Sequence, residues 1–95
     1  MDGLGLLRCI CDETRFGILE ELGGGEKTVG QIVQKIKRDQ PLVSHHLRTL
    51  KECGIVSSRN SGRNVMYSIS SRHLSDLIEQ IRKTSHEMND VCCVR

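Results

Sequence analysis

The sequence predicts a mainly α-helical fold with one β-hairpin, in the order of four helices, two strands and a last helix. Apolar residues recur three and four positions apart along most of the chain, which is typical of amphipathic helices. Near residue 65 the spacing changes to alternation, beside a turn rich in Asn and Gly, which is typical of a hairpin. The 95 residues support one domain, residues 1–95, with a core built mostly from Leu, Ile and Val.

Two short helices are expected before residue 23. The first is marked by apolar residues at helical spacing, Leu4, Leu7 and Ile10, and is interrupted near Asp12. Asp12 can cap the second helix, since its carboxylate can accept a backbone N–H of the first turn. The second apolar stripe consists of Phe16, Leu19 and Leu22, with Ile18 alongside. The three glycines at 23–25 end this helix.

A pair of helices joined by a short basic turn follows. Thr28 and Gln31 have the spacing of a capping box and open the third helix. Its inward residues are Val29, Ile32, Val33 and Ile36. Residues 39–53 predict the fourth helix, with Asp39 as its N-cap and Gly54 just beyond its end.

The fourth helix has two distinct faces. Val43, Leu47 and Leu50 recur at helical spacing and are expected to face the core. The opposite face carries hydrogen-bonding and basic side chains: Gln40, Ser44, His45, Arg48 and Lys51. Two helices joined by a tight polar turn, the second with a polar outer face, form the helix-turn-helix arrangement. We therefore expect residues 39–53 to be a recognition helix for double-stranded DNA.

A hairpin and a final helix complete the chain. Residues 55–69 predict the hairpin, with a turn at 60–64. Arg59 and Arg63 put charge on its stem and tip, as a wing lying along a phosphate backbone requires. Residues 71–89 predict the last helix, and its apolar stripe consists of Leu74, Leu77, Ile78, Ile81 and Met88. No further element of the chain can cover this stripe, so we expect a second copy to cover it in a homodimer.

Charge is concentrated in one segment of the chain. Residues 1–34 carry a net charge of −3, residues 35–67 carry seven basic against two acidic residues, or +5, and residues 68–95 are neutral. A basic face that meets only water would not explain this clustering, whereas a polyanionic partner would. Within the segment, we expect Lys35, Lys37 and Arg38 to contact DNA phosphates.

Other classes of protein fit the sequence poorly. No stretch is long and apolar enough to span a bilayer, and the N-terminus lacks a signal-peptide pattern, so we expect a cytoplasmic protein with no membrane partner. An enzyme is not expected, because neither an acidic residue placed to orient the histidine nor an oxyanion loop accompanies a histidine and cysteine pair, and the glycines form no phosphate-binding pattern. Five cysteines, an odd number, argue against a disulfide scaffold.

The order of elements and four sequence segments closely resemble the ArsR/SmtB family of winged-helix repressors. The segments that carry the resemblance are residues 12–19, residues 43–50, Gly54-Ile55-Val56, and Gly62-Arg63 with Tyr67. The resemblance implies a homodimeric DNA-binding repressor that a metal, metalloid or redox signal releases from DNA. It also implies DNA contacts by Gln40, Ser44 and His45, and by Arg63 in the wing. Pro41 departs from the small hydrogen-bonding residue that often stands there in the family, so we expect the recognised DNA sequence to differ in detail.

The family's known metal sites are largely missing from this sequence. Thr28 and Gly30 stand where a metalloid-binding pair of cysteines would lie in the third helix. In the last helix, Asp76 and His86 are at best two of the four ligands of a tetrahedral zinc site.

Cysteines at both ends of the chain remain as candidates for sensing. By the resemblance, the first and last helices pack together at the dimer interface, where sulfur atoms far apart in sequence can meet. The candidate metal ligands are Cys9, Cys11, Cys92 and Cys93. Three or four thiolates there would select a soft ion such as arsenite, cadmium or zinc. Two alternatives stay open: a reversible disulfide between the ends, and a structural set in a regulator without an effector.

Two further residues of the fourth helix are expected to be structural. Cys53 ends the apolar stripe and should be a small buried hydrophobe. His46 lies at the margin of the stripe, where we expect a partly buried histidine that is bonded to a carbonyl and does not contact DNA.

Overall fold

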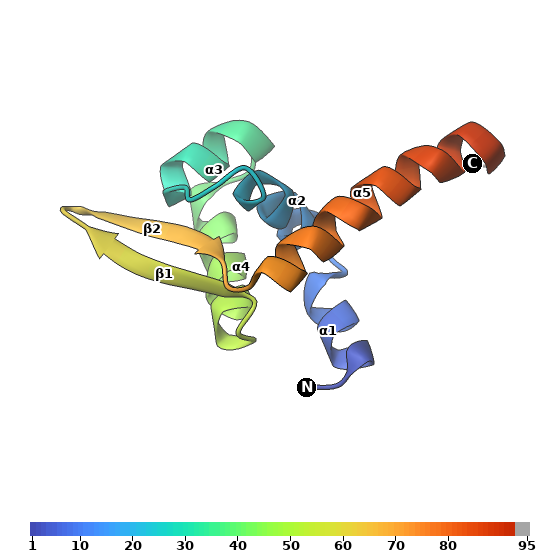
Figure 1. Ribbon diagram of the computed structural model, residues 1–95. Helices are drawn as coiled ribbons and strands as arrows, with labels where there is room; N and C mark the ends of the chain where they lie inside the picture. The colour runs from blue at the N-terminus through green and yellow to red at the C-terminus, as the bar shows by residue number, and fades with distance from the viewer. Residues whose placement is uncertain (93–95) are drawn as a thin grey trace.

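A computed structural model describes residues 1–92, with side chains up to residue 89. The described residues form, in order, α1 (Gly3–Ile10), α2 (Glu13–Leu22), α3 (Val29–Ile36), α4 (Gln40–Glu52), β1 (Val56–Ser61), β2 (Asn64–Ile69) and α5 (Arg72–Cys92). The hairpin projects from one end of the molecule and α5 from the other (Figure 1). The predicted fold class and order of elements are confirmed. Within residues 1–92, no helix is both long and apolar enough to cross a membrane.

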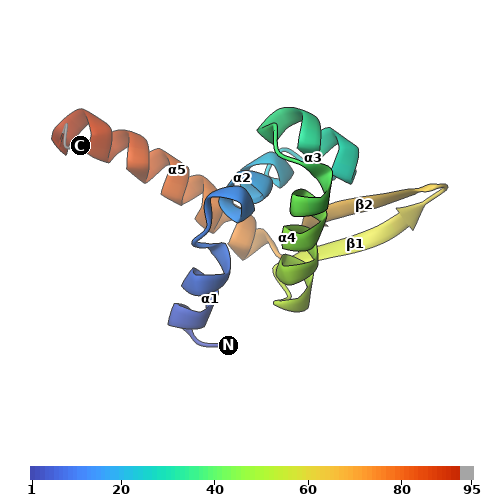
Figure 2. The same cartoon turned by 180° about the vertical axis from the view of Figure 1, so that it is seen from behind.

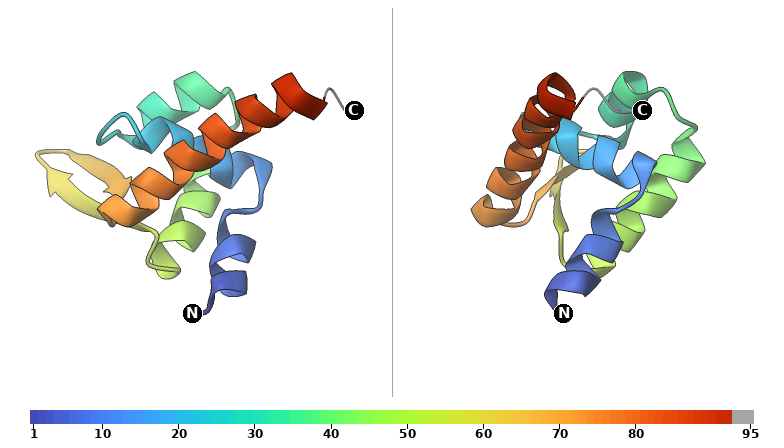
Figure 3. Two further views of the ribbon diagram at one scale, coloured as in Figure 1. Left: turned by 45° about the vertical axis from the view of Figure 1, so that its right-hand side comes forward. Right: turned by 90° about the vertical axis from the view of Figure 1, so that its right-hand side faces the viewer.

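The second helix is the centre of the packing. Helix α2 contacts all four other helices and β2. Seen from the end of the molecule, α5 lies on one side of α2, and α3 and α4 lie on the other (right-hand view of Figure 3). The buried core is aliphatic and consists of Ile10, Ile18, Leu19, Leu22, Ile32, Val43, Leu47, Leu50, Ile55, Val56 and Ile78. Phe16 and Tyr67 are half-buried and pack against the edge of this aliphatic core.

Two of the predicted helix caps form as expected. The Asp12 carboxylate accepts the backbone N–H of Arg15 at 3.0 Å, so α2 begins directly after Asp12. Thr28 and Gln31 make both bonds of the capping box, at 3.2 and 2.9 Å. Asp39 is the N-cap of α4 by position, but within the described residues its side chain accepts no capping hydrogen bond. Packing of the apolar face of α4 therefore does more to define this helix than its cap does.

The hairpin spans nearly the predicted range, but its turn is tighter and its strands extend further towards the tip than predicted. Ser61 pairs with Asn64, so the loop is only Gly62 and Arg63. Gly62 has φ 62°, in the left-handed region that glycine adopts without a steric penalty. The hairpin extends beyond α4 (Figure 2), so burial falls from the base, where Val56 is buried, towards the tip. The alternation of β2 therefore predicts a strand correctly but does not predict which of its side chains are buried.

The apolar stripes of α1 and α5 are only partly covered. Ile10 is buried, whereas Leu4 and Leu7 in the same helix are 56% and 53% exposed. In α5, Ile78 is buried against the core while Leu77 and Met88 are 37% and 46% exposed; Leu74 and Ile81 are half-buried. Both helices thus carry apolar side chains on the surface.

Candidate DNA interface

The outer face of α4 is polar because its inner face is fixed on the core. Val43, Leu47 and Leu50 are each at most 1% exposed, which sets the rotation of the helix. The side chains that face outward are all exposed: Gln40, Ser44, His45, Arg48 and Lys51. They offer an amide, a hydroxyl, an imidazole and two cationic groups, which suit hydrogen bonds to base edges and phosphates. The face predicted from the helical spacing is the one that is exposed.

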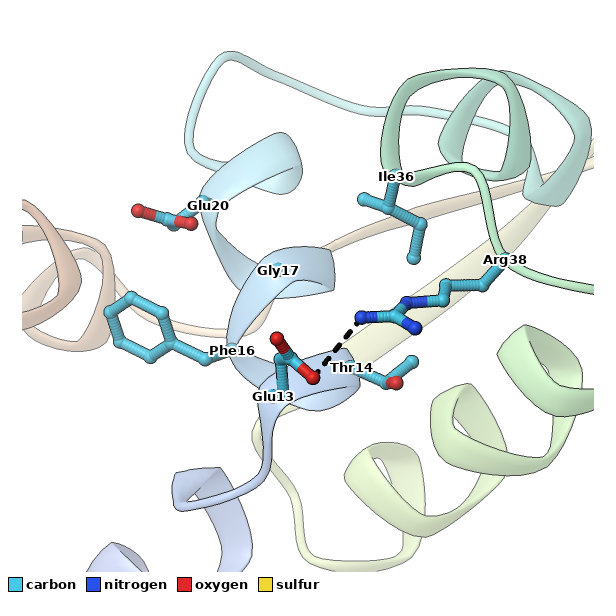
Figure 4. Close-up of a pocket in the computed structure, with 7 residues that line it drawn as sticks. All are labelled: Glu13, Thr14, Phe16, Gly17, Glu20, Ile36 and Arg38. Carbon is cyan, nitrogen blue, oxygen red and sulfur yellow. Dashed lines mark ion pairs between the residues drawn. The ribbon is translucent and has the colours of Figure 1, made fainter.

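The turn between α3 and α4 presents two basic residues. Lys37 closes α3 in the left-handed conformation, with φ 57° and ψ 48°, and its side chain is exposed. Arg38 instead directs its guanidinium to α2, where Nη2 lies 3.1 Å from Oε1 of Glu13, beside a hollow lined by Phe16 and Ile36 (Figure 4). The side chains of Arg38 and Glu13 are 43% and 86% exposed, and such surface pairs contribute about 0–1 kcal/mol. Arg38 can therefore leave Glu13 at little cost in stability.

The stem of the wing is tied to the loop before α3. Arg59 makes a bidentate pair with Glu26, with both N–O distances at 2.7 Å. This hydrogen bonding from Arg59 lowers the pKa of Glu26. The backbones of Lys27 and Tyr67 also exchange two hydrogen bonds, at 3.0 and 2.8 Å. Arg59 is thus engaged in holding the hairpin, and Arg63 at the tip is exposed.

His46 lies at the interface between α4 and the N-terminal helices. Its side chain is 13% exposed, with Nδ1 3.2 Å from Nη1 of Arg15 and Nε2 3.8 Å from Oδ2 of Asp12. Arg15 also donates from Nε to the carbonyl of Cys9, so its guanidinium joins α1 to α4. His46 is partly buried, as expected. The prediction that it bonds to a carbonyl was wrong, because its Nδ1 atom contacts the guanidinium of Arg15 in α2 instead.

The cysteines are arranged differently from the set that we expected to bind a metal. Cys9 lies against Cys53, with the two Sγ atoms 2.7 Å apart, while Cys11 is exposed. Helix α5 ends at Cys92, and this end of the helix lies away from α1 (Figures 1 and 2). Cys93 lies outside the described residues. Among the described residues, no group of three His, Cys, Asp or Glu side chains could hold a metal ion. Cys53 is half-buried as part of a thiol pair, which the periodicity of α4 did not predict.

Comparison with known proteins identifies the family. Residues 12–58 match the description "Bacterial regulatory protein, arsR family". The chain is 36% identical over 73 residues to the HTH-type transcriptional repressor SmtB of Mycobacterium tuberculosis, covering 77% of this chain and 54% of SmtB. It is 35% identical over 81 residues to a cadmium resistance transcriptional regulatory protein CadC homolog of Staphylococcus aureus, covering 84% of this chain and 67% of that protein. The chain thus spans just over half the length of SmtB.

A solved structure agrees with this assignment. The homodimeric winged helix-turn-helix DNA-binding domain of Mb0332 from Mycobacterium bovis superposes with a TM-score of 0.75 at 25% identity. The match covers 84% of this chain and 74% of that domain. The chain belongs to the arsR family of bacterial regulatory proteins, which are transcriptional regulators rather than enzymes.

Proposed function

We propose that this chain is a homodimeric, sequence-specific DNA-binding repressor. The observation that carries the proposal is the exposed polar face of α4, set directly opposite a fully buried apolar stripe. In a two-fold dimer, two such helices enter successive major grooves about 34 Å apart on an inverted repeat. The relatives, which include a transcriptional repressor and a DNA-binding domain, support the same function.

Each side chain of the interface has a distinct proposed part. Gln40 can pair with adenine and Arg48 with guanine through two hydrogen bonds each, and each such pair gives about 1–3 kcal/mol of discrimination. Ser44 and His45 supply further single hydrogen bonds to base edges. Phosphates are held by basic side chains on both sides of α4: Lys37, Arg38 and Arg63.

The proposed dimer rests on the exposed apolar side chains of the terminal helices. Leu4 and Leu7 of α1 and Leu77 and Met88 of α5 are between 37% and 56% exposed. A second copy that covers them would remove a large apolar surface from water, which stabilises association. Mb0332, a structural neighbour, is described as homodimeric, which supports the same assembly.

As a second candidate function, we propose that a soft ion such as cadmium, arsenite or zinc releases the protein from DNA. The name of the CadC homolog refers to cadmium resistance, and thiolates prefer soft ions. The proposed ligands are Cys9, Cys11, Cys92 and Cys93. Because the end of α5 lies away from α1 in one chain, we propose that these cysteines meet between the two copies of the dimer. Titration with cadmium should give a thiolate-to-metal absorption band and release of DNA, and the absence of both would contradict this function.

Selection from a library of random duplexes tests the main proposal without a known operator. After rounds of binding to the reduced protein, sequencing should return an inverted repeat whose half-sites lie about 10 base pairs apart. Affinity for the selected duplex should fall steeply between low and moderate salt, because the basic side chains displace counterions. A library that stays random after selection would overturn the proposal.

A further inference from the structure

Two thiols from distant parts of the chain meet at the base of the recognition helix. Cys9 lies in the last turn of α1, and Cys53 is the C-cap of α4. Their Sγ atoms are 2.7 Å apart, and both residues are half-buried. This separation is close to the length of a disulfide bond, about 2.05 Å, so little movement separates the thiol pair from a bonded pair. Partial exposure leaves the pair open to small oxidants.

We propose that Cys9 and Cys53 form a reversible intrachain disulfide that ties α1 to the end of α4 and weakens DNA binding. The bond itself depends only on the thiol pair, whereas its effect on DNA rests on the proposed function. The pair differs from the cysteines at the two chain ends, because Cys53 lies in the middle of the sequence.

The reaction needs a two-electron oxidant, and hydrogen peroxide is the one we name. A thiolate of the pair attacks one peroxide oxygen and breaks the O–O bond, which gives a sulfenic acid and a hydroxide that takes a proton to become water. The second sulfur then attacks the sulfenic sulfur, and the leaving hydroxide takes the second thiol proton. In total, two thiols lose two electrons and two protons, and one peroxide becomes two waters.

The surroundings of Cys53 disfavour its thiolate form. The hydrogen bond with Cys9 and burial raise the pKa of the Cys53 thiol, and the charge of Arg15 offsets this only in part. A thiol with a raised pKa is a poorer source of thiolate. Arg15 also holds the carbonyl of Cys9, which fixes the end of α1 beside α4.

A bond at Cys53 acts on both elements that are proposed to touch DNA. Gly54 follows with φ 80°, and its position between α4 and β1 makes it the joint between the recognition helix and the wing. The Ser70 hydroxyl contacts the carbonyls of Gly54 and Ile55, so the base of the wing is joined to the same point. A covalent link from this joint to α1 restricts the adjustment of α4 and the wing to the DNA.

The test uses a variant of the 95-residue chain in which Cys11, Cys92 and Cys93 are replaced by Ser. After treatment with hydrogen peroxide in the presence of a chelator, peptide mapping should find Cys9 linked to Cys53 in a single chain. Dithiothreitol should reverse the bond. Affinity for the duplex selected with reduced protein should be at least about five-fold weaker in the oxidised form, the lower end of typical coupling between sites. Cys9→Ser and Cys53→Ser in the same background should show no change on oxidation, and circular dichroism confirms that each is folded.

Three results would overturn the inference. The pair could stay reduced under peroxide that oxidises a free thiol of similar exposure, it could link only between chains, or the mapped intrachain bond could leave affinity unchanged. Failure of the reduced protein to bind any selected duplex would instead contradict the proposed function, and peptide mapping would still decide whether the bond forms.

Discussion

At the scale of a single residue, Asp12 connects a helix cap to the recognition helix. Its carboxylate caps α2 through the N–H of Arg15 and lies 3.8 Å from His46 of α4. We predict that Asp12→Ala lowers the free energy of unfolding by about 0.5–2 kcal/mol, whereas Asp12→Asn, which keeps an acceptor oxygen, loses less. Urea denaturation of the three proteins at neutral pH measures both differences. Equal stability of Asp12→Ala and the wild type would contradict the role of the cap.

The same carboxylate predicts a dependence on pH. The hydrogen bond from the Arg15 backbone, with His46 and Arg15 nearby, lowers the pKa of Asp12 in the folded protein. A lowered pKa means that the ionised form stabilises the fold fully above the ordinary Asp value of about 3.9, and that this contribution is lost as the pH falls below it. The stability advantage of the wild type over Asp12→Asn should therefore shrink as the pH falls below about 4.

Side-chain partners were the part of the site that the sequence could not predict. Arg59 was expected to lie on the wing and does, but its partner Glu26 is 33 positions away, and Cys53 meets Cys9 across 44 positions. Helical spacing determines which face a residue occupies, and it contains no information on which distant residue approaches that face. Local signals such as the Thr28 capping box were predicted correctly because both partners lie within one turn.

At the scale of an element, the wing should contribute affinity without sequence preference. Arg63 is exposed in a two-residue loop, and its proposed partner is a phosphate. We predict that Arg63→Ala weakens binding to all duplexes by a similar factor and reduces the slope of log affinity against log salt by about 1. Titrations at several salt concentrations measure the slope.

Arg82→Ala provides a matched control for the wing. Arg82 is also an exposed arginine, but it pairs with Glu79 on α5, away from the wing. The control should leave the slope unchanged. If both variants reduced the slope of log affinity against log salt equally, Arg63 would contribute only through the net charge of the protein.

The terminal helices show what the sequence predicts at this scale and what it leaves open. The stripe of α5 was identified by its spacing, yet Ile78 packs on the core while Leu77 and Met88 are exposed. Periodicity marks apolar positions but does not divide them between the chain's own core and an interface. The division follows from the direction of α5, which leaves the body of the molecule after its first turns (Figure 1).

At the scale of the whole molecule, we predict that the exposed apolar side chains of α5 hold a dimer together. Leu77→Glu combined with Met88→Glu should convert the dimer to a monomer in sedimentation experiments, because charged groups cannot be buried there without partners. When the dimer is lost, affinity for the selected inverted repeat should also fall, because each half-site is then bound independently.

Val65→Glu is the control for this change. Val65 is 39% exposed on the wing, so Val65→Glu places one glutamate, half the charge added by the double variant, at a comparable apolar surface site outside α1 and α5. This variant should remain a dimer. A double variant of α5 that also sediments as a dimer would show that the interface lies elsewhere.

The central claim is that the outer face of α4 reads DNA bases, and a matrix of affinities tests it most directly. Dissociation constants are measured for wild type and His45→Ala with the selected duplex and with each single base-pair change in one half-site. We predict that His45→Ala weakens binding to the selected duplex and removes the base preference at one position of the half-site, while the other positions keep theirs. A uniform weakening at every position, like that expected for Arg63→Ala, would contradict the claim that this face reads sequence.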